Sequence, residues 1–474
     1  MTDILFISPD SSKEVYQGLA DRYSAIEPPI WALLLASQLG EYDSKILDPL
    51  AERLSDRDAL IRILNDRPKL ICFVVYGQNP NSGTTNMAGA VRLAKMIKES
   101  EALPIAIVGS HASALPEETL ALRCFDYVIP GDGIQGLRKV MQQGVKEGVV
   151  WAPSSYLNTN LYNTYALPWK KLPTLDHYRC HTWHCNFDES KRSPFAAIYT
   201  SLGCPFKCDF CMINLVNREK PDQLDAAQSS GIRYFSTEFV LNELATLQSM
   251  GVRNVRLSDE MFFLNRQHYL PILDGIIASG LDLNLWAYAR VDTVRPEHLP
   301  RFKRAGINWL CLGIESGNQK VRREAAKGSY EDVDVRQVAR EIRDSGINLL
   351  ANFIVGLPGD DLKSMNETLD LALELNAEHT NIYPCMPLPG SPLYRESPVK
   401  HADFSAYSFH SYDCQPLPTK YLSAADVLEF RDYAWERTAL DPAHLSLIDR
   451  KFGTAGQIQE QAKLKLKRRL LEAA

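Results

Sequence analysis

The sequence predicts an α/β protein with two parallel sheets and a helical C-terminal region. At roughly 100–200 residues per domain, its 474 residues imply two to four domains. Two long stretches alternate short β-branched runs with helical patterns, which is typical of parallel sheets covered by helices. We expect a Rossmann-like (flavodoxin-like) domain over residues 1–140, a connector over 141–192, a partial (β/α)6 barrel over 193–395 and a helical cap over 396–474.

Five short strands are predicted in the N-terminal domain. They are Asp3–Pro9, Asp43–Pro49, Leu70–Tyr76, Pro104–Gly109 and Tyr127–Pro130. The last three lead into loops of glycine and polar residues, at the sheet edge where open α/β sheets bind ligands. No G-x-G-x-x-G follows the first strand, which disfavours a dinucleotide-binding domain.

Six further strands are predicted in the second stretch. They are Ala196–Thr200, Asn254–Leu257, Asn284–Tyr288, Trp309–Ile314, Leu349–Val355 and Thr380–Cys385. Six βα units fit an incomplete barrel, since a closed one has eight. Residues 424–438 and the basic run 463–469 are expected to be helical and to cap the barrel, with the basic run as a solvated helix face.

The composition disfavours several classes of protein. With 52 basic and 58 acidic residues the net charge is −6, the wrong sign for a protein whose main partner is a nucleic acid. The sequence has no run of about 18 apolar residues that could span a membrane, and no signal-peptide pattern at its start. We therefore expect a cytoplasmic protein whose partners include neither nucleic acid nor membrane. In that reducing compartment, a tight cysteine cluster indicates metal binding or redox chemistry.

Three cysteines converge within eight residues, directly after the strand that ends at Thr200. Cys204, Cys208 and Cys211 have the spacing C-x3-C-x2-C. Thiolates select zinc or iron–sulfur clusters. A structural zinc site needs four ligands, whereas three cysteines on a four-iron cluster leave one iron open. Four residues upstream could supply a fourth zinc ligand: Cys180, His181, His184 and Cys185.

This loop, with the aromatic Phe210 before its last cysteine, resembles the signature of the radical S-adenosylmethionine (SAM) superfamily. The resemblance implies that Cys204, Cys208 and Cys211 hold a [4Fe–4S] cluster, with Phe210 beside the cofactors. The open iron would be chelated by the amino and carboxylate groups of SAM. One electron would then cleave SAM to methionine and a 5′-deoxyadenosyl radical. A flavodoxin- or ferredoxin-type protein is the implied electron donor.

The resemblance also implies SAM contacts at the ends of later barrel strands, where catalytic residues of such folds lie. Asp259 and Glu260 match the acidic position that holds the SAM ammonium group. Arg290 is expected to pair with the SAM carboxylate, because a guanidinium forks onto carboxylates. The alternative for Arg290 is an ion pair with Asp292 at the barrel rim.

Two further turns complete the implied SAM site. Glu315 and Ser316 match a polar turn that contacts the ribose and methionine parts. Asn352 and Gly356 lie in a segment that resembles the adenine-binding G-x-I-x-G-x-x-E element. Here the first glycine is Asn352 and the terminal glutamate is replaced by Gly359.

The N-terminal domain resembles the cobalamin-binding domain that precedes many radical SAM barrels. Glycines at strand ends would let a corrin approach the backbone closely. The implied contacts are Gly77, Gln78, Gly109, Ser110 and Gly131. The D-x-H-x-x-G element that places a histidine on cobalt is absent, and we expect His111 to be a structural loop residue. The sequence leaves open whether cobalamin is bound.

These features favour a radical SAM enzyme that removes hydrogen from an unactivated carbon of a polar small molecule, of natural-product or aminosugar type. The favoured outcome is cobalamin-dependent C-methylation. Cobalamin-free dehydration of a diol-containing sugar or aminoglycoside is the alternative, and a non-catalytic iron–sulfur or zinc protein is a third. Cys311, Cys385 and Tyr383 are candidate donors of hydrogen or a proton inside the barrel, although buried cysteines are often packing residues.

Overall fold

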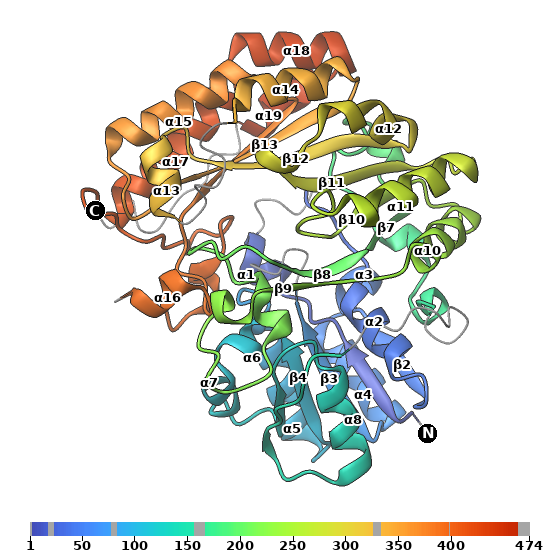
Figure 1. Ribbon diagram of the computed structural model, residues 1–474. Helices are drawn as coiled ribbons and strands as arrows, with labels where there is room; N and C mark the ends of the chain where they lie inside the picture. Colours follow the sequence, from blue (N-terminus) through green and yellow to red (C-terminus); the bar gives the residue numbers. More distant parts are fainter. Residues whose placement is uncertain are drawn as a thin grey trace.

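The computed structural model describes residues 2–17, 23–76, 83–155, 166–325, 333–397 and 399–462. Within these ranges the chain forms two parallel six-stranded sheets and a C-terminal group of helices (Figure 1). The predicted fold class is confirmed. Gly77 and Gln78, together with the basic run 463–469, lie outside the described residues.

The N-terminal sheet has the strand order β2-β1-β3-β4-β5-β6, and all neighbouring strands are parallel. Helices pack on both faces of this sheet: α2 and α8 cover one face, and α4 and α5 cover the other. The chain reverses direction across the sheet between β1 and β3, which is the topological switch point where such sheets bind ligands. The strands are β1 (Ile4–Ile7), β2 (Ser44–Leu47), β3 (Leu70–Val75), β4 (Ile105–Gly109), β5 (Tyr127–Ile129) and β6 (Gly148–Val149). The covering helices are α2 (Ile30–Gln38), α4 (Asp56–Asp66), α5 (Met87–Ser100) and α8 (Ile134–Gln143).

The second sheet has the order β14-β13-β12-β11-β10-β7, so strands that follow one another in the chain are neighbours in space. This is the arrangement of a barrel with six of its eight strands. All six strands were predicted, with ends within a few residues. They are β7 (Phe195–Ile198), β10 (Asn254–Leu257), β11 (Asn284–Arg290), β12 (Ile307–Glu315), β13 (Asn348–Val355) and β14 (His379–Pro384). The helices between and after them are α10 (Thr237–Ser249), α11 (Arg266–Ala278), α12 (Leu299–Arg304), α13 (Gln319–Glu324), α14 (Val335–Asp344), α15 (Leu362–Leu375), α16 (Pro392–Glu396) and α17 (Ala424–Ala439).

A small antiparallel sheet lies between the two large ones (Figure 1). It consists of β8 (Ser201–Cys204) and β9 (Gly231–Tyr234), with Cys204 opposite Gly231. The sequence pattern did not predict this pair, because neither Ser201–Cys204 nor Gly231–Tyr234 is an apolar run and the two strands lie far apart in the chain. It carries the first cysteine of the C-x3-C-x2-C loop into the space between the domains.

The predicted connector does more than join the domains. Its Trp183 packs against Trp286 and Trp309, with ring centroids 5.1 Å apart in each case. Helix α18 (Pro442–Phe452) adds Ile448 and Phe452 to this cluster. Connector and C-terminal helices thus fill the barrel at the N-terminal ends of its strands. The predicted boundaries at residues 140, 192 and 395 stay proposals; the two large sheets span residues 4–149 and 195–384.

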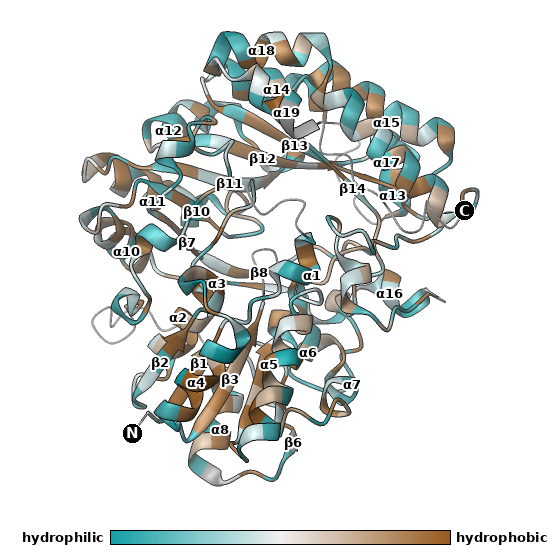
Figure 2. Ribbon diagram, turned by 180° about the vertical axis from the view of Figure 1, so that it is seen from behind, coloured by the Kyte–Doolittle hydropathy of each residue, from teal (hydrophilic) through white to brown (hydrophobic). Residues whose placement is uncertain are grey.

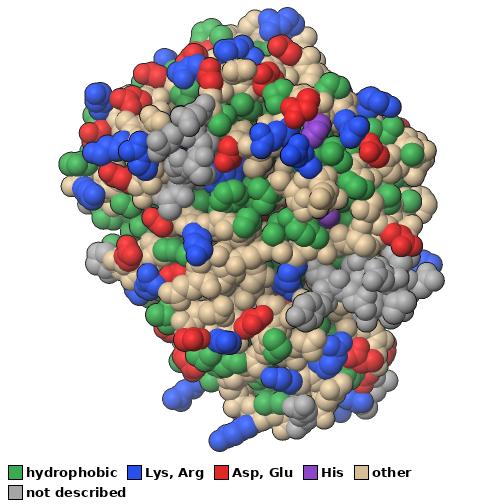
Figure 3. Space-filling view, in the orientation of Figure 1, with side chains coloured by type: hydrophobic (Ala, Val, Ile, Leu, Met, Phe, Trp, Pro, Cys, Tyr) green, Lys and Arg blue, Asp and Glu red, His purple; other side chains and the backbone are tan. Residues whose placement is uncertain are grey.

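Hydrophobic residues concentrate on the strands, whereas the outer helices have mixed colours (Figure 2). On the face in Figure 3, acidic and basic side chains are interspersed. In the part of the chain that the structure describes, no helix is both long and apolar enough to cross a membrane.

Candidate active site

The three cysteines lie on one loop, and two hydrogen bonds made by Asn214 hold this loop closed. The backbone N–H of Cys204 donates to Asn214 Oδ1 (2.8 Å), and Asn214 Nδ2 donates to the Phe206 carbonyl (3.1 Å). Burial raises the pKa of the Cys211 thiol, and the neighbouring Cys208, Glu260 and Cys204 raise it further. Thiols that are buried together in this way become stable thiolates only beside a cation, so the donor set fits a cluster of iron ions.

Two of the four residues considered as a fourth zinc ligand, His184 and Cys185, bind backbone carbonyls. His184 Nε2 contacts the Asn284 carbonyl (2.8 Å), and Cys185 Sγ donates to the carbonyls of Thr182 (3.2 Å) and Asp188 (3.1 Å). Over the described ranges, no group of three or more His, Cys, Asp or Glu side chains is arranged to hold a single metal ion. The described side chains thus form no four-ligand zinc site. The ligands of a four-iron cluster bind different irons and need not surround a single ion.

A cavity of about 830 Å³ lies between the N-terminal domain and the barrel. All three cysteines border it. So do seven other residues predicted to bind cofactor or react: Phe210, Glu260, Arg290, Glu315, Asn352, Tyr383 and Cys385. The other described candidates do not line this cavity: Asp259, Ser316, Gly356, Cys311, Gly109, Ser110 and Gly131.

The acidic pair after β10 divides into two roles. Asp259 is fully buried and accepts hydrogen bonds from the Thr200 backbone N–H (2.6 Å), the Thr200 hydroxyl (2.7 Å) and the Ser201 hydroxyl. Burial raises its pKa to about 6. Asp259 therefore ties β10 to the start of β8, while Glu260 faces the cavity beside the cysteines.

Arg290 forms the rim ion pair that was the alternative prediction for it, and pairing with the SAM carboxylate stays a prediction. Its Nε and Nη2 donate to the carboxylate of Asp292 at 2.9 and 3.2 Å. Its guanidinium lies 3.9 Å from the centroid of the Phe206 ring and borders the cavity. The ion pair and the ring together hold the guanidinium near the cysteine loop.

The turn after β12 is conformationally strained. Glu315 has φ 70°, in the left-handed region that favours glycine. Its neighbour Ser316 is fully buried: its hydroxyl lies 3.2 Å from Thr368 Oγ1 and accepts from the Asn318 N–H. Ser316 therefore holds the turn in place, and Glu315 borders the cavity.

Gly356 lies below α17 and not in the cavity wall. Its φ is 79°, and a Cβ there would overlap the side chain of Val427 on α17. The nearby Asp360 accepts from the Leu357 N–H (3.0 Å) and from the Ser364 hydroxyl (2.6 Å). This glycine turn thus lets the C-terminal helix approach the barrel closely.

The candidate radical quenchers occupy two depths of the barrel. Cys385 and Tyr383 border the cavity, whereas Cys311 lies behind Asn352 and accepts from its Nδ2 (2.8 Å). Burial raises the pKa of both thiols and of the Tyr383 hydroxyl. These groups therefore stay protonated at neutral pH and could donate hydrogen.

An ion pair that the sequence analysis missed lies in the cavity wall. Arg256 Nη1 donates to Glu27 Oε1 (2.8 Å) and Oε2 (2.9 Å), and the two side chains are 4% and 6% exposed. The guanidinium also lies over the rings of Trp286 (4.8 Å) and Tyr288 (5.4 Å). The sequence signal that could have revealed this pair is Arg256, a charged residue in the middle of a predicted buried strand. The pair joins the N-terminal domain to the barrel interior.

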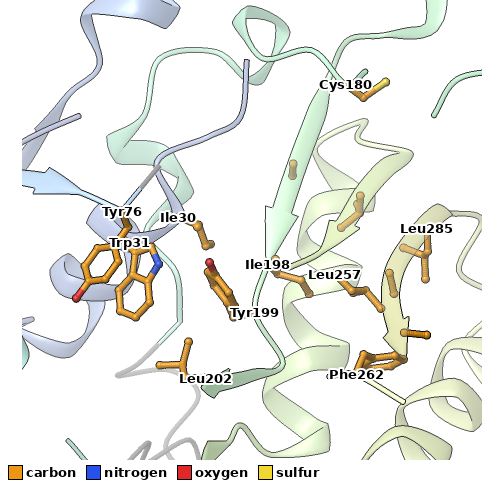
Figure 4. Close-up of a cluster of buried hydrophobic side chains, with 14 of the residues drawn as sticks. Ile30, Trp31, Tyr76, Cys180, Ile198, Tyr199, Leu202, Leu257, Phe262 and Leu285 are labelled. Atoms are coloured by element: carbon orange, nitrogen blue, oxygen red, sulfur yellow. The ribbon is translucent and has the colours of Figure 1, made fainter. Parts of the chain in front are cut away.

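The N-terminal domain meets the cavity at β1, β2 and β3, through Ser8, Asp48 and Tyr76. Tyr76 stacks on Trp31 (4.0 Å), and Tyr199 of the barrel lies on the far side of Trp31 at 5.7 Å (Figure 4). This is the switch-point edge where a ligand of such a sheet is expected.

Two of the predicted corrin contacts, Gly109 at the end of β4 and Gly131 after β5, pack against protein backbone. A Cβ on Gly109 would overlap the Val75 carbonyl, and one on Gly131 would lie 2.5 Å from the Arg218 carbonyl. At both glycines the missing side chain therefore leaves room for a carbonyl of the chain's own backbone. His111 is buried, and its Nδ1 lies 3.1 Å from Thr84 Oγ1, in keeping with a structural histidine.

Comparison with known proteins agrees with this site. Residues 198–372 match the sequence model of the Radical SAM superfamily. An uncharacterized methyltransferase of Pyrococcus horikoshii is 26% identical over 379 residues, which cover 77% of this chain and 78% of that protein. An anaerobic magnesium-protoporphyrin IX monomethyl ester cyclase of Rubrivivax gelatinosus is 24% identical over 428 residues, 86% of this chain and 72% of the cyclase.

A similar solved structure is the radical SAM methyltransferase TsrM from Kitasatospora setae with cobalamin and a [4Fe–4S] cluster bound. It covers both chains completely with a TM-score of 0.64 and 15% identity, which shows a common fold. Residues 198–372 therefore form a radical SAM domain, which implies a [4Fe–4S] cluster and SAM as cofactors, and the chain as a whole shares the fold of that cobalamin-bound structure.

Proposed function

We propose that the chain is a cobalamin-dependent radical SAM C-methyltransferase whose substrate is a small molecule held between the two large sheets. The observation that carries the proposal is the cavity. Its wall combines the three cysteines, the barrel interior and the switch-point edge of the N-terminal sheet. The similarity to the Pyrococcus methyltransferase and to the fold of TsrM supports methyl transfer.

The residues around the cysteine loop are proposed to bind SAM. The cluster would supply the electron that cleaves SAM. Glu260 faces the cavity beside Cys211 and is placed to accept from an ammonium group. Arg290, held by Asp292, is placed to pair with a carboxylate. Asn352, whose Oδ1 accepts from Asn381 Nδ2 (3.0 Å), offers a fixed amide to the adenine side.

Cobalamin is proposed to lie over β1, β2 and β3, because that part of the sheet edge borders the cavity. A bound cobalamin would supply the methyl group. Ser8, Asp48 and Tyr76 are the chain's groups at this edge. Among the described residues of the N-terminal domain, no histidine borders the cavity, so this wall offers no imidazole to cobalt.

The substrate is proposed to be a natural product with both apolar and polar parts. Aromatic rings of Trp286, Tyr288 and Tyr383 supply apolar wall, and the Arg256–Glu27 pair supplies a fixed dipole. An aminosugar stays a prediction from the sequence, as does a flavodoxin- or ferredoxin-type electron donor. One of the relatives is named a cyclase, which describes ring formation and not methylation. The product of the substrate radical must therefore be measured.

The test is anaerobic purification with added hydroxocobalamin, followed by the visible spectrum of the desalted protein. The proposal predicts a corrin band in stoichiometric amount. It also predicts that candidate substrates acquire the label from methyl-labelled SAM. A protein that cleaves SAM but retains no corrin would contradict methyl transfer and favour cobalamin-free dehydration, in which Cys385 or Tyr383 returns the hydrogen.

A further inference from the structure

The strand pair that carries Cys204 is fastened to the N-terminal domain. Cys204 ends β8 opposite Gly231 of β9, and Asn217 Nδ2 donates to the Gly231 carbonyl (2.9 Å). The neighbouring Gly203 has φ 87°, and a Cβ there would overlap the same carbonyl. A shift of β9 would therefore shift Cys204 with it.

Arg233 on β9 makes the link to the N-terminal domain. Its Nη1 donates to Asp132 Oδ2 (2.8 Å) and to the Ser155 carbonyl (2.5 Å), and its Nε donates to Asn217 Oδ1 (3.1 Å). Asp132 is 3% exposed and lies between β5 and α8. One guanidinium thus connects the cluster-bearing strands to the N-terminal sheet.

A second arginine fastens the other end of the cysteine loop. Arg218, directly after the 3-10 turn Ile213–Asn217, donates from Nη1 to the carbonyls of Ser113 and Ala114 (3.0 Å to the latter). Its own carbonyl packs against Gly131, and the Tyr76 hydroxyl donates to the Gly131 carbonyl. Gly131 and Asp132 therefore both contact the radical SAM domain.

We propose that the loop Gly131–Gly133 positions the iron–sulfur cluster. Asp132 binds Arg233 of β9, and Gly131 packs against the Arg218 carbonyl at the end of the cysteine loop. Through these two contacts the N-terminal domain fixes the position of the cysteine loop relative to the cavity. In some proteins a buried ion pair fixes a specific geometry while adding little net stability. The sequence resemblance had implied that Gly131 contacts a corrin; its contacts point to the cluster. The inference rests on the radical SAM assignment and not on cobalamin binding.

The test compares Asp132→Asn and Arg233→Lys with the wild-type holoenzyme. Asparagine keeps an acceptor for the Ile134 backbone N–H, which Asp132 Oδ1 now serves, so the loop keeps its turn. Its NH2 group replaces Oδ2, which accepts from the Ser155 N–H and from Arg233, so the link to β9 is lost. Lysine keeps the charge of Arg233 but loses the forked contacts. The matched control is Asp126→Asn, which removes a partly buried ion pair with Lys98 at the other end of β5.

Three quantities are measured after anaerobic reconstitution: the EPR spectrum of the reduced cluster with and without SAM, the Kd for SAM, and the corrin content. For Asp132→Asn and Arg233→Lys we expect an altered EPR spectrum and roughly tenfold weaker SAM binding. Corrin content should match the wild type, and the control should change none of the three.

Loss of corrin with an unchanged EPR spectrum and Kd would overturn the proposal, because the loop would then serve cobalamin. Equal changes in all three variants, or no change in any, would overturn it as well. If Asp132→Asn does not fold, Arg233→Lys tests the same contact from the barrel side. If the wild type retains no corrin, the methyltransferase proposal fails while the EPR and Kd measurements still decide this one.

Discussion

Replacing Glu27 by glutamine should destabilise the fold strongly, because it leaves the Arg256 guanidinium buried without its carboxylate. Both side chains are at most 6% exposed, and both carboxylate oxygens lie within 2.9 Å of Nη1. A guanidinium cannot lose its proton in a protein, so the charge stays. Breaking such a pair from one side costs about 3–5 kcal/mol, which is the loss of unfolding free energy expected for Glu27→Gln.

The opposite variant, Arg256→Met, should behave differently with pH. Burial raises the pKa of Glu27, and Arg256 opposes that rise. Without Arg256 the carboxyl can take up a proton as the pH falls and so escape the cost of a buried charge. The destabilisation by Arg256→Met should therefore shrink from pH 8 to pH 5, whereas that by Glu27→Gln should not. The double variant should lose less than the sum of the two single losses.

The assay is urea unfolding of the metal-free protein at pH 8 and pH 5, followed by tryptophan fluorescence, since Trp286 lies 4.8 Å from the guanidinium. The control is Arg253→Gln, which removes an exposed pair with Asp282 just before β10 and should cost less than about 1 kcal/mol. Strict additivity in the double variant, or a Glu27→Gln loss no larger than the control's, would refute the reasoning.

Three further changes test other parts of the molecule. Burial raises the pKa of Asp48 from 3.8 to about 7, so this group lowers stability as the pH rises from about 4 to 7; Asp48→Asn should flatten that decline in urea midpoints measured at pH 5 and 8, and an unchanged slope would show that Asp48 is not its source. Cys208→Ala should abolish the cluster's visible absorption after reconstitution while leaving the circular dichroism spectrum intact, and a retained chromophore would contradict the ligand assignment. Gly356→Val should cost about 2–4 kcal/mol, because it combines a positive φ with overlap against Val427 of α17; Gly453→Ala, also at positive φ but in open space, is the control for backbone strain alone in thermal melts.

Local sequence patterns were enough to predict the repeated strand–helix units of the barrel. Several barrel strands, such as Ile307–Glu315, contain a short apolar run and are followed by a helical pattern, so their positions could be predicted from the sequence. The three cysteines are equally local, because eight residues of one loop contain them all. The resemblance then supplied Glu260 and Arg290, which the fold brings to the same cavity wall.

Contacts between distant parts of the chain could not be predicted in this way. Glu27 and Arg256 are 229 positions apart, and no periodicity relates them. Gly131 was singled out because glycines at strand ends admit ligands, but the group it admits is the Arg218 carbonyl. The acidic pair after β10 gave no sign of which carboxylate would face the cavity. That choice depends on Thr200 and Ser201, which bind Asp259.

The central claim is that the cluster on Cys204, Cys208 and Cys211 keeps one iron free to bind SAM. The most direct measurement is the EPR spectrum of the reduced, reconstituted enzyme with SAM isotopically labelled at its amino nitrogen. We predict a change in g values on SAM addition and a hyperfine coupling from the labelled nitrogen. An identical spectrum with and without SAM, from a cluster at full iron content, would contradict it.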